Sequence, residues 1–221
     1  MNFTRYGIYF TPRPGAFARV GASWLGWDIA QGQMIGTPDD NVTLRPHKYG
    51  FHGTIKPPFR LTDGKTLDDL QAALDQHAAL LPSVALEGLT LSRIGSFLAM
   101  VPVGDTRELA EMAAQVVRGL DIFRAPPDED ELARRRRSDL TQLQEENLKT
   151  WGYPYVMAAF KFHMTLTGPL PRAHFGKVME EASTHFGDLP PRPFVIDSLT
   201  LVGEADGGKF HEIYRYTLTG K

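Results

Sequence analysis

The chain has 221 residues, with 24 basic and 26 acidic side chains, a formal net charge of −2 and a sequence pI near 6.4. This balance excludes a strong electrostatic pull toward nucleic acid or an anionic membrane surface, and 42% hydrophobic residues suffice for a sizeable core. Without cysteine there is no disulfide, thiol nucleophile or cysteine metal site, which fits a cytoplasmic protein.

The sequence also shows no sign of a membrane partner or a secretory leader. No apolar run approaches the roughly 20 residues that a membrane helix needs. The first residues, MNFTRYGIYFTPRPG, lack a basic head followed by a long apolar stretch, so we expect no signal peptide.

The first half of the chain alternates strand and helix patterns. Aromatic and β-branched residues predict a strand at 6–10, and a helix over 16–28 is predicted to carry Trp24 and Trp27. A short strand at 51–55 should stop at Pro57-Pro58, because proline cannot donate to a ladder. The other expected elements are a loop at 32–46, a helix over 67–81, a hairpin of strands 84–92 and 96–103 around Gly95, and a helix over 106–123.

The second half begins with a segment of different texture. Residues 126–150 open with acids and continue with bases, an order that suits a helix dipole and predicts a helical insertion. The sequence then predicts an aromatic turn at WGYPYV, a strand at 158–167, a helix over 173–186 and strands at 194–202 and 209–219 joined by EADGG.

One short phrase occurs twice, as FHGTIKPPF from Phe51 and FHMTLTGPL from Phe162. Each copy precedes a predicted helix and hairpin, and 38 and 37 residues separate its histidine from the threonine of GLTL and SLTL. This order predicts a duplicated unit. We therefore expect one bilobal domain over 1–221, with lobe one at 1–104, lobe two at 105–221 and the two motifs facing each other across a cleft.

The paired motifs suit acid–base chemistry on a phosphate. Strand residues two apart share a face, so His52 with Thr54, and His163 with Thr165, should point into the cleft. One imidazole can accept a proton while the other donates one, and the hydroxyls can donate to phosphate oxygens. The natural substrate is a phosphodiester, above all a cyclic one, and the chemistry needs no metal or cofactor.

These residues resemble the 2H phosphoesterase superfamily, or LigT-like fold, which is named for two His-x-Thr/Ser-apolar motifs. The resemblance covers the whole chain in order and spacing. It implies an α+β fold of two pseudo-symmetric lobes, each with an antiparallel sheet and flanking helices, around a central cleft. It also implies hydrolysis of cyclic phosphates or action on 2′–5′ linkages, with His52 and His163 as catalytic histidines and Thr54 and Thr165 as hydroxyl positions.

A narrower resemblance lies in LTQLQEENLKTWGYPYVMAAFKFHMTLTGPL, residues 140–170. This stretch is similar to a bacterial subfamily of phosphonate metabolism proteins (DUF1045), encoded near carbon–phosphorus lyase genes. The resemblance implies a small sugar cyclic phosphate or a related ester from phosphonate breakdown. The helical insertion at 126–150 exceeds a minimal LigT-like lobe, so the substrate range of tRNA-processing members should not be copied.

Several further residues are candidates for binding the substrate. Lys161 lies two before His163 and Lys56 four after His52, so either can contact phosphate, and the tyrosines after Gly152 can wall the pocket. The arginine run 134–137 is interpreted as a solvated helix face, or as part of a lid over the cleft. The substrate-binding candidates are Lys56, Lys161, Tyr153, Tyr155, Arg13, Arg45 and Tyr9.

Two alternatives to a small-molecule cyclic phosphodiesterase stay open. The first is RNA end chemistry, as a 2′,3′-cyclic phosphodiesterase or 2′–5′ ligase, against which the acidic pI argues. The second is a non-catalytic module that binds a phosphorylated ligand, although simple binding would favour arginine or lysine over twin histidines. The sequence assigns neither the acid and base roles nor an oligomeric state.

Overall fold

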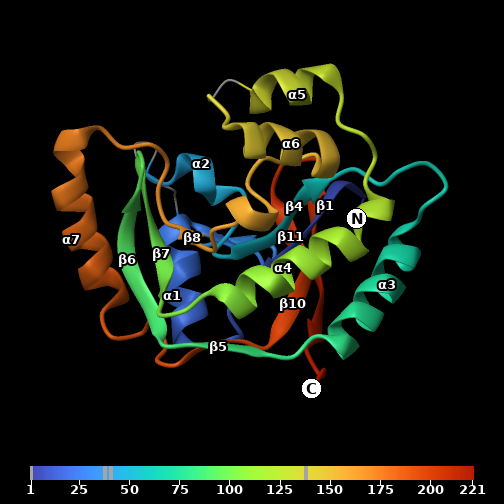
Figure 1. Cartoon of the computed structure of the whole chain (residues 1–221). Helices are drawn as coiled ribbons and strands as arrows, with labels where there is room; N and C mark the ends of the chain where they lie inside the picture. Colours follow the sequence, from blue (N-terminus) through green and yellow to red (C-terminus); the bar gives the residue numbers. More distant parts are fainter. Residues whose placement is uncertain (1, 37–38, 40–41, 137–138) are drawn as a thin grey trace.

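The computed structural model describes residues 2–36, 39, 42–136 and 139–221. The chain is an α+β protein with antiparallel strand pairs and helices packed around them (Figure 1). The strands are β1 (Phe3–Phe10), β2 (Trp27–Asp28), β3 (Gln33–Met34), β4 (Gly53–Phe59), β5 (Val84–Leu86), β6 (Gly88–Ile94), β7 (Phe97–Val103), β8 (Met164–Thr165), β9 (Phe194–Ile196), β10 (Ser198–Ala205) and β11 (Phe210–Thr217). The helices are α1 (Ala16–Leu25), α2 (Leu44–His47), α3 (Leu67–Leu80), α4 (Arg107–Gly119), α5 (Glu129–Arg135), α6 (Gln142–Trp151) and α7 (Phe175–Phe186), with short 3₁₀ turns η1 (Asp121–Phe123), η2 (Met157–Ala159) and η3 (Arg172–His174).

The main sheet has two parts that meet at its centre. Its seven strands follow the order β11-β10-β1-β4-β8-β7-β6. Within the described residues, β4 and β8 pair at a single position, Gly53↔Met164. The sheet therefore divides there into a four-stranded lobe with β4 and a three-stranded lobe with β8.

The two repeats are interlocked. When β2, β3 and α2 of the first half and α5, α6 and the 3₁₀ turns of the second half are left out, the order β1-α1-β4-α3-β5-β6 recurs as β7-α4-β8-α7-β9-β10, with β11 following the second copy. The junction of the repeats then lies at residues 95–96. The last strand of each repeat pairs with the first strand of the other, β6 with β7 and β10 with β1. The predicted lobe boundary at 104/105 is therefore wrong as a division of the sheet, because the four-stranded lobe takes β10 and β11 from the far end of the chain.

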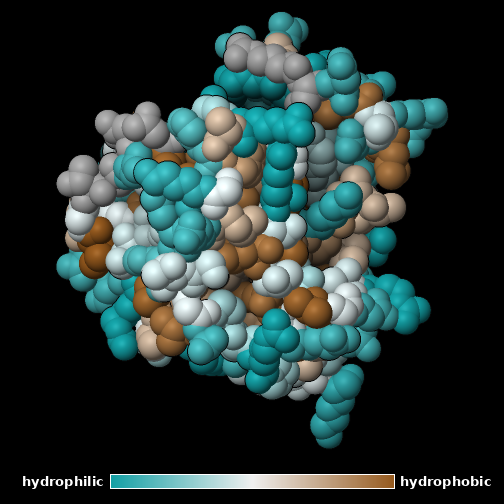
Figure 2. Space-filling view, turned by 90° about the vertical axis from the view of Figure 1, so that its left-hand side faces the viewer, coloured by the Kyte–Doolittle hydropathy of each residue, from teal (hydrophilic) through white to brown (hydrophobic). Residues whose placement is uncertain are grey.

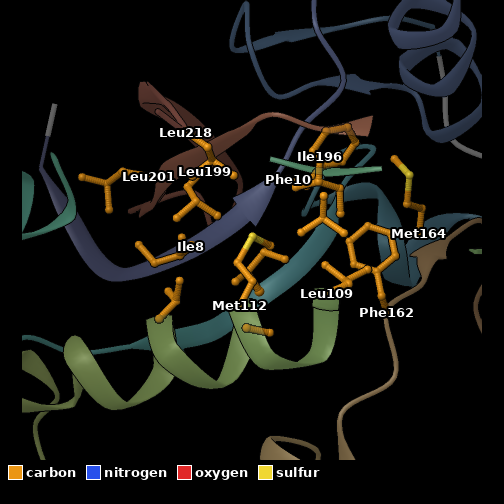
Figure 3. Close-up of a cluster of buried hydrophobic side chains, with 14 of the residues drawn as sticks. Ile8, Phe10, Leu109, Met112, Phe162, Met164, Ile196, Leu199, Leu201 and Leu218 are labelled. Atoms are coloured by element: carbon orange, nitrogen blue, oxygen red, sulfur yellow. The ribbon is translucent and has the colours of Figure 1, made fainter. Parts of the chain in front are cut away.

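Helices α3 and α4 cover the apolar face of the four-stranded lobe. A capping box between Thr66 and Asp69 starts α3, and Leu70 and Leu74 bury one side of it. Figure 3 shows Leu109 and Met112 of α4 packed toward Ile8 and Phe10 of β1, with strand residues of β10 behind them. Burying this cluster fixes which face of β1 and β4 points to the core and which is left for a site.

Helices α1 and α7 lie against the three-stranded lobe. Trp24 of α1 donates its indole N–H to the Leu166 carbonyl, 2.9 Å away, just after β8. Figure 2 looks onto this side of the molecule, where hydrophobic residues gather in the middle of the face and hydrophilic side chains surround them. No helix in the described ranges is long and apolar enough to cross a membrane.

Several sequence predictions fail at element ends, and three of them have a clear physical reason. The helix predicted over 16–28 ends at Leu25, because Gly26 adopts a left-handed φ of 76° and the chain enters β2. Strand β4 runs through Pro57 and Pro58, since the register shifts there and the bulge requires no N–H donor from them. The strand predicted at 158–167 shrinks to β8, because β4 and β8 diverge from their single paired position.

The predicted insertion at 126–150 is largely helical in its described part. It contains α5 and most of α6, which lie above the main sheet in Figure 1. Asp128 and Thr141 cap their N-termini through side-chain oxygens. Arg137 of the predicted arginine run lies outside the described residues.

Candidate active site

The two motif histidines stand at equivalent positions, each one residue before a central strand. His52 precedes β4 and His163 precedes β8, and the residues that follow them, Gly53 and Met164, form the pair that joins the lobes. A Cβ on Gly53 would lie 2.2 Å from the Phe162 ring, so only glycine allows this close approach. The junction of the lobes therefore brings both histidines to the same place.

The same backbone device orients both imidazole rings. Nδ1 of His52 lies 2.9 Å from the Gly50 carbonyl oxygen, and Nδ1 of His163 lies 2.8 Å from the Lys161 carbonyl oxygen. A carbonyl only accepts, so each Nδ1 carries the hydrogen and donates it. In the neutral ring, Nε2 is then the nitrogen with a lone pair, and it is the one available for proton transfer.

The surroundings of the two rings differ. Tyr9 stacks on His52 with ring centroids 3.8 Å apart and planes 19° apart, whereas Phe97 lies 5.6 Å from His163 in a tilted contact. The pKa of His52 is lowered to about 4, chiefly by burial; the hydrogen bond to the Gly50 carbonyl opposes this shift, and the nearby charge of His163 adds to it. His52 is therefore neutral near pH 7.

The motif threonines lie on the same face as the histidines. Thr54 Oγ1 is 3.0 Å from Nε2 of His52, and it donates to that nitrogen when the ring is neutral. Thr54 pairs with Tyr9 of β1, and Thr165 pairs with Ala99 of β7, so the two hydroxyls occupy matching sheet positions. Both are only partly buried, which leaves them able to reach a ligand.

A cavity of about 360 Å³, here called the histidine compartment, collects these groups. Its size lies in the range typical of small-molecule sites. Its lining residues are Arg5, Tyr9, Arg45, Pro46, Tyr49, Gly50, His52, Thr54, Pro57, Pro58, Phe97, Arg135, Tyr153, His163, Thr165, Thr167, Gly168 and Pro169.

A second cavity of about 700 Å³, the aromatic compartment, adjoins the first. Both are lined by Thr54, Pro57, Phe97, Tyr153 and His163, so they form one continuous cleft. The aromatic compartment extends between the tip of the β6–β7 hairpin and α6. Its other lining residues are Ile55, Ile94, Gly95, Ser96, Thr141, Leu143, Gln144, Tyr155, Val156, Ala159, Phe160 and Lys161.

Most of the substrate-binding candidates lie on this cleft. Tyr9 and Arg45 line the histidine compartment, and Tyr153 lines both compartments. Lys161 and Tyr155 line the aromatic compartment and are exposed. Their contact with a substrate stays a prediction.

Lys56 and Arg13 lie elsewhere, against the prediction. A register shift opposite β1 leaves Ile55 unopposed and turns Lys56 to the core face, where it is 1% exposed. Its Nζ lies 3.2 Å from the Val117 carbonyl and 3.4 Å from Asp121. Arg13 is exposed and pairs with Asp197 at 2.8 Å, and it does not line the cleft.

Among the lining residues of the histidine compartment that were not predicted, four carry a charged or aromatic side chain: Arg5, Tyr49, Phe97 and Arg135. Arg5 lies four residues before Tyr9 in β1 and therefore on the same strand face, so strand alternation could have predicted it. Arg135 belongs to the run interpreted as a solvated face, yet its guanidinium lies 4.5 Å from the Tyr153 ring centroid. Tyr49 and Phe97 carry no motif, and only the folded chain brings them to the histidines.

Within the described residues, no group of three or more histidine, aspartate or glutamate side chains could hold a metal ion. The arginines that line the histidine compartment are Arg5, Arg45 and Arg135, and the two motif histidines lie beside them. The side chains of this compartment can supply proton transfer and anion binding.

Fold and site together define an α+β protein whose two His-x-Thr strands meet at the joint of two lobes. The model of a family described as "Protein of unknown function (DUF1045)" matches residues 54–211, and the chain belongs to that family.

Curated relatives include two proteins named "Ribose 1,5-bisphosphate phosphokinase PhnN". The one from Janthinobacterium sp. (strain Marseille) is 34% identical over 235 residues, covering 100% of this chain and 52% of the relative. The one from Laribacter hongkongensis (strain HLHK9) is 29% identical, covering 96% of this chain and 51% of the relative. The chain thus spans about half the length of these relatives.

Solved structures similar to the chain include TT0787 of Thermus thermophilus, with 15% identity, a TM-score of 0.49 and coverage of 98% of this chain and 99% of that one. Another is E. coli LigT complexed with NADP+, with 14% identity, a TM-score of 0.42 and 99% coverage of each chain.

Proposed function

We propose that this chain is a metal-independent phosphodiesterase that hydrolyses a cyclic phosphate of a small sugar or nucleotide. One observation carries the proposal: two histidines, each held through Nδ1 by a backbone carbonyl, border one small cavity together with both motif threonines. Paired imidazoles of this kind are suited to transferring one proton in and one proton out.

In the proposed reaction, water attacks the phosphorus atom and one P–O bond of the ring breaks, giving a phosphomonoester and a free hydroxyl. His52 accepts the water proton, since a base must be unprotonated and burial keeps this ring neutral at neutral pH. His163 donates the proton to the leaving oxygen. When substrate binds, the Thr54 hydroxyl turns from Nε2 of His52 to the phosphate, and Thr54 and Thr165 then donate hydrogen bonds to the non-bridging oxygens, where charge accumulates.

The names of the curated relatives support a sugar phosphate. Those proteins are named for ribose 1,5-bisphosphate, and opening a 1,2-cyclic phosphate on ribose 5-phosphate at O2 yields that compound. The chain matches about half of each relative, so we propose that this half supplies the bisphosphate in phosphonate catabolism.

A nucleotide substrate is the second candidate. The aromatic compartment places Phe97, Tyr153, Tyr155 and Phe160 around one space beside His163, and such rings can stack on a base. This feature favours a 2′,3′-cyclic phosphodiesterase or a 2′–5′ ligase acting on RNA ends.

The test is hydrolysis, with EDTA present, of ribose cyclic phosphates, the four nucleoside 2′,3′-cyclic phosphates and a 2′–5′ dinucleotide. We expect turnover of the ribose compounds and a loss of about 10²- to 10⁴-fold in kcat for both His52→Ala and His163→Ala. His174→Ala, at an exposed histidine outside the cleft, is the matched control and should retain activity.

Turnover of the nucleotide substrates alone would contradict a sugar phosphate substrate and favour the second candidate, an enzyme that acts on RNA ends. Absence of turnover, or activity that survives loss of either motif histidine, would contradict catalysis and leave a phosphate-binding module.

A further inference from the structure

The histidine compartment holds more positive charge than one cyclic phosphate requires. Arg5, Arg45 and Arg135 line it, and its described lining residues include no aspartate or glutamate. A cyclic phosphodiester carries a single negative charge, and in the proposed reaction His163 and the motif threonines already provide its donors. The arginines therefore need a separate explanation.

Arg5 is occupied within the fold. Its Nε and Nη2 donate to the two carboxylate oxygens of Glu204, at 2.5 and 2.9 Å, which joins β1 to β10. This bidentate pair uses two of its donors and offsets its charge. Arg5 is thus a support of the compartment rather than its free cation.

Arg135 has a weaker partner and a fixed position. It lies 3.5 Å from Glu131, at the limit of a hydrogen bond, and its side chain is 28% exposed. Stacking on Tyr153 holds the guanidinium on the compartment wall. The residue comes from α5, so the segment inserted between η1 and α6 delivers a cation to the site.

Arg45 approaches from another wall. It belongs to α2 and lies along Gly168, where a Cβ would stand 3.5–3.7 Å from the arginine side chain. Within the described part of the chain, Arg45 forms no hydrogen bond or ion pair. Its guanidinium donors are therefore available to a ligand in the compartment that it lines.

We propose that Arg45 and Arg135 bind a second phosphate of the substrate, a monoester separate from the reacting cyclic phosphate. The substrate class is then a small sugar that carries both groups, which the compartment of about 360 Å³ suits in size. Arginine is well matched to this task, because its planar fork can donate two parallel hydrogen bonds to phosphate oxygens. The inference rests on the proposed function for the reacting phosphate.

The kinetic test uses substrate pairs that differ by one phosphate: ribose 1,2-cyclic phosphate and uridine 2′,3′-cyclic phosphate, each with and without a 5-phosphate. Arg45→Gln and Arg135→Gln should each lower kcat/KM for the 5-phosphorylated member about 10- to 100-fold. The same variants should change kcat/KM for the unphosphorylated member less than about 3-fold. Arg134→Gln, at an exposed neighbour on α5 outside the cleft, is the matched control.

The binding test needs no turnover. Calorimetry on His163→Ala should show that the 5-phosphate tightens binding at least about 10-fold, and that adding Arg135→Gln removes the difference. This result with no hydrolysis by wild type would retain the second-phosphate site and refute the proposed function. Equal affinity for both members of each pair, or equal losses on both in the arginine variants, would overturn the inference.

Discussion

The two motif histidines are alike in backbone and unlike in surroundings. Each ring is fixed by the carbonyl two residues before it, yet only His52 is stacked closely under a tyrosine. The repeated backbone arrangement thus holds the two imidazoles in the same tautomer. The aromatic neighbours differ: Tyr9 of β1 stacks on His52, and Phe97 of β7 contacts His163 at a tilt. We propose that this difference in surroundings makes His52 the base and His163 the acid.

The Tyr9 ring should control the acid limb of the pH profile. In wild type, kcat/KM should fall as pH drops through about 4, because protonation removes the neutral form of His52. Tyr9→Leu admits water to the ring, so the limb should move up toward the unperturbed value of 6.5. Phe97→Leu, beside His163, should leave this limb in place, and an unmoved limb in Tyr9→Leu would contradict the assignment of His52 as base.

Residue patterns predicted which motif side chains line the cleft better than they predicted the side chains around them. His52, His163 and their threonines follow from a repeated phrase, because strand alternation places each pair on one face. The same alternation predicted that Lys56 would face the cleft, but a bulge between Thr54 and Lys56 turns it to the opposite face. No local sequence pattern indicates that bulge. Arg135 was hidden in a charge run, since its role depends on Tyr153, a residue 18 positions away in the chain.

Among the elements, β4 is tied to the end of α4 by a buried lysine. Lys56 reaches the Val117 carbonyl of α4 and the Asp121 carboxylate of η1, which also pairs with Arg124 at 2.8 Å. Burial lowers the pKa of Lys56 to about 8, and the charge of Asp121 opposes that shift. The contacts of Lys56 therefore hold β4 against α4 and η1, although burying the ammonium group is itself unfavourable.

Lys56→Met should show that these contacts affect stability and not catalysis. We expect kcat/KM within about 3-fold of wild type, and a free energy of unfolding at pH 7 that is unchanged or raised by about 1–2 kcal/mol. The folded pKa lies below the unfolded value of 10.5, so the unfolded wild type binds more protons between about pH 8 and 10.5. The wild-type free energy of unfolding should gain a rising contribution there, and the variant should lack it. A large loss of activity would instead restore Lys56 as a substrate ligand.

The helices with clear apolar periodicity were predicted well, as α3 and α7 show. The strand at 158–167 was not, because its residues satisfy strand propensity while β4 offers them a partner at one position. The compact insertion α5–α6 was predicted as helical, but its placement above the cleft depends on tertiary contacts such as Arg60 with Asp128, at 2.7 Å.

At the scale of the molecule, the close contact of Gly53 with the Phe162 ring sets the spacing of the two lobes where β4 meets β8. Gly53→Ala would place a Cβ 2.2 Å from a ring that is itself packed against Phe10 and Phe194. We expect a loss of about 1–3 kcal/mol in the free energy of unfolding from overpacking. Displacement of β4 from β8 should lower kcat about 10²-fold through misplaced histidines.

The control for this prediction is Gly176→Ala in α7, where a Cβ would meet nothing within 4 Å. Denaturant unfolding and steady-state kinetics measure both variants. The double variant Gly53→Ala/Phe162→Leu should recover part of the activity by removing ring atoms. Wild-type kinetics in Gly53→Ala would show that the spacing of the lobes does not govern the reaction.

The exchange of β6 and β10 between the lobes makes each repeat depend on the other. Each repeat contributes one histidine, and each completes its sheet with a strand of the other. A single repeat by itself would carry one motif histidine and an unpaired sheet edge, so both repeats are needed to complete the site and the sheet. Within one chain the two repeats need not be identical, so the two histidines can have different neighbours, Tyr9 in one case and Phe97 in the other, and can take different roles.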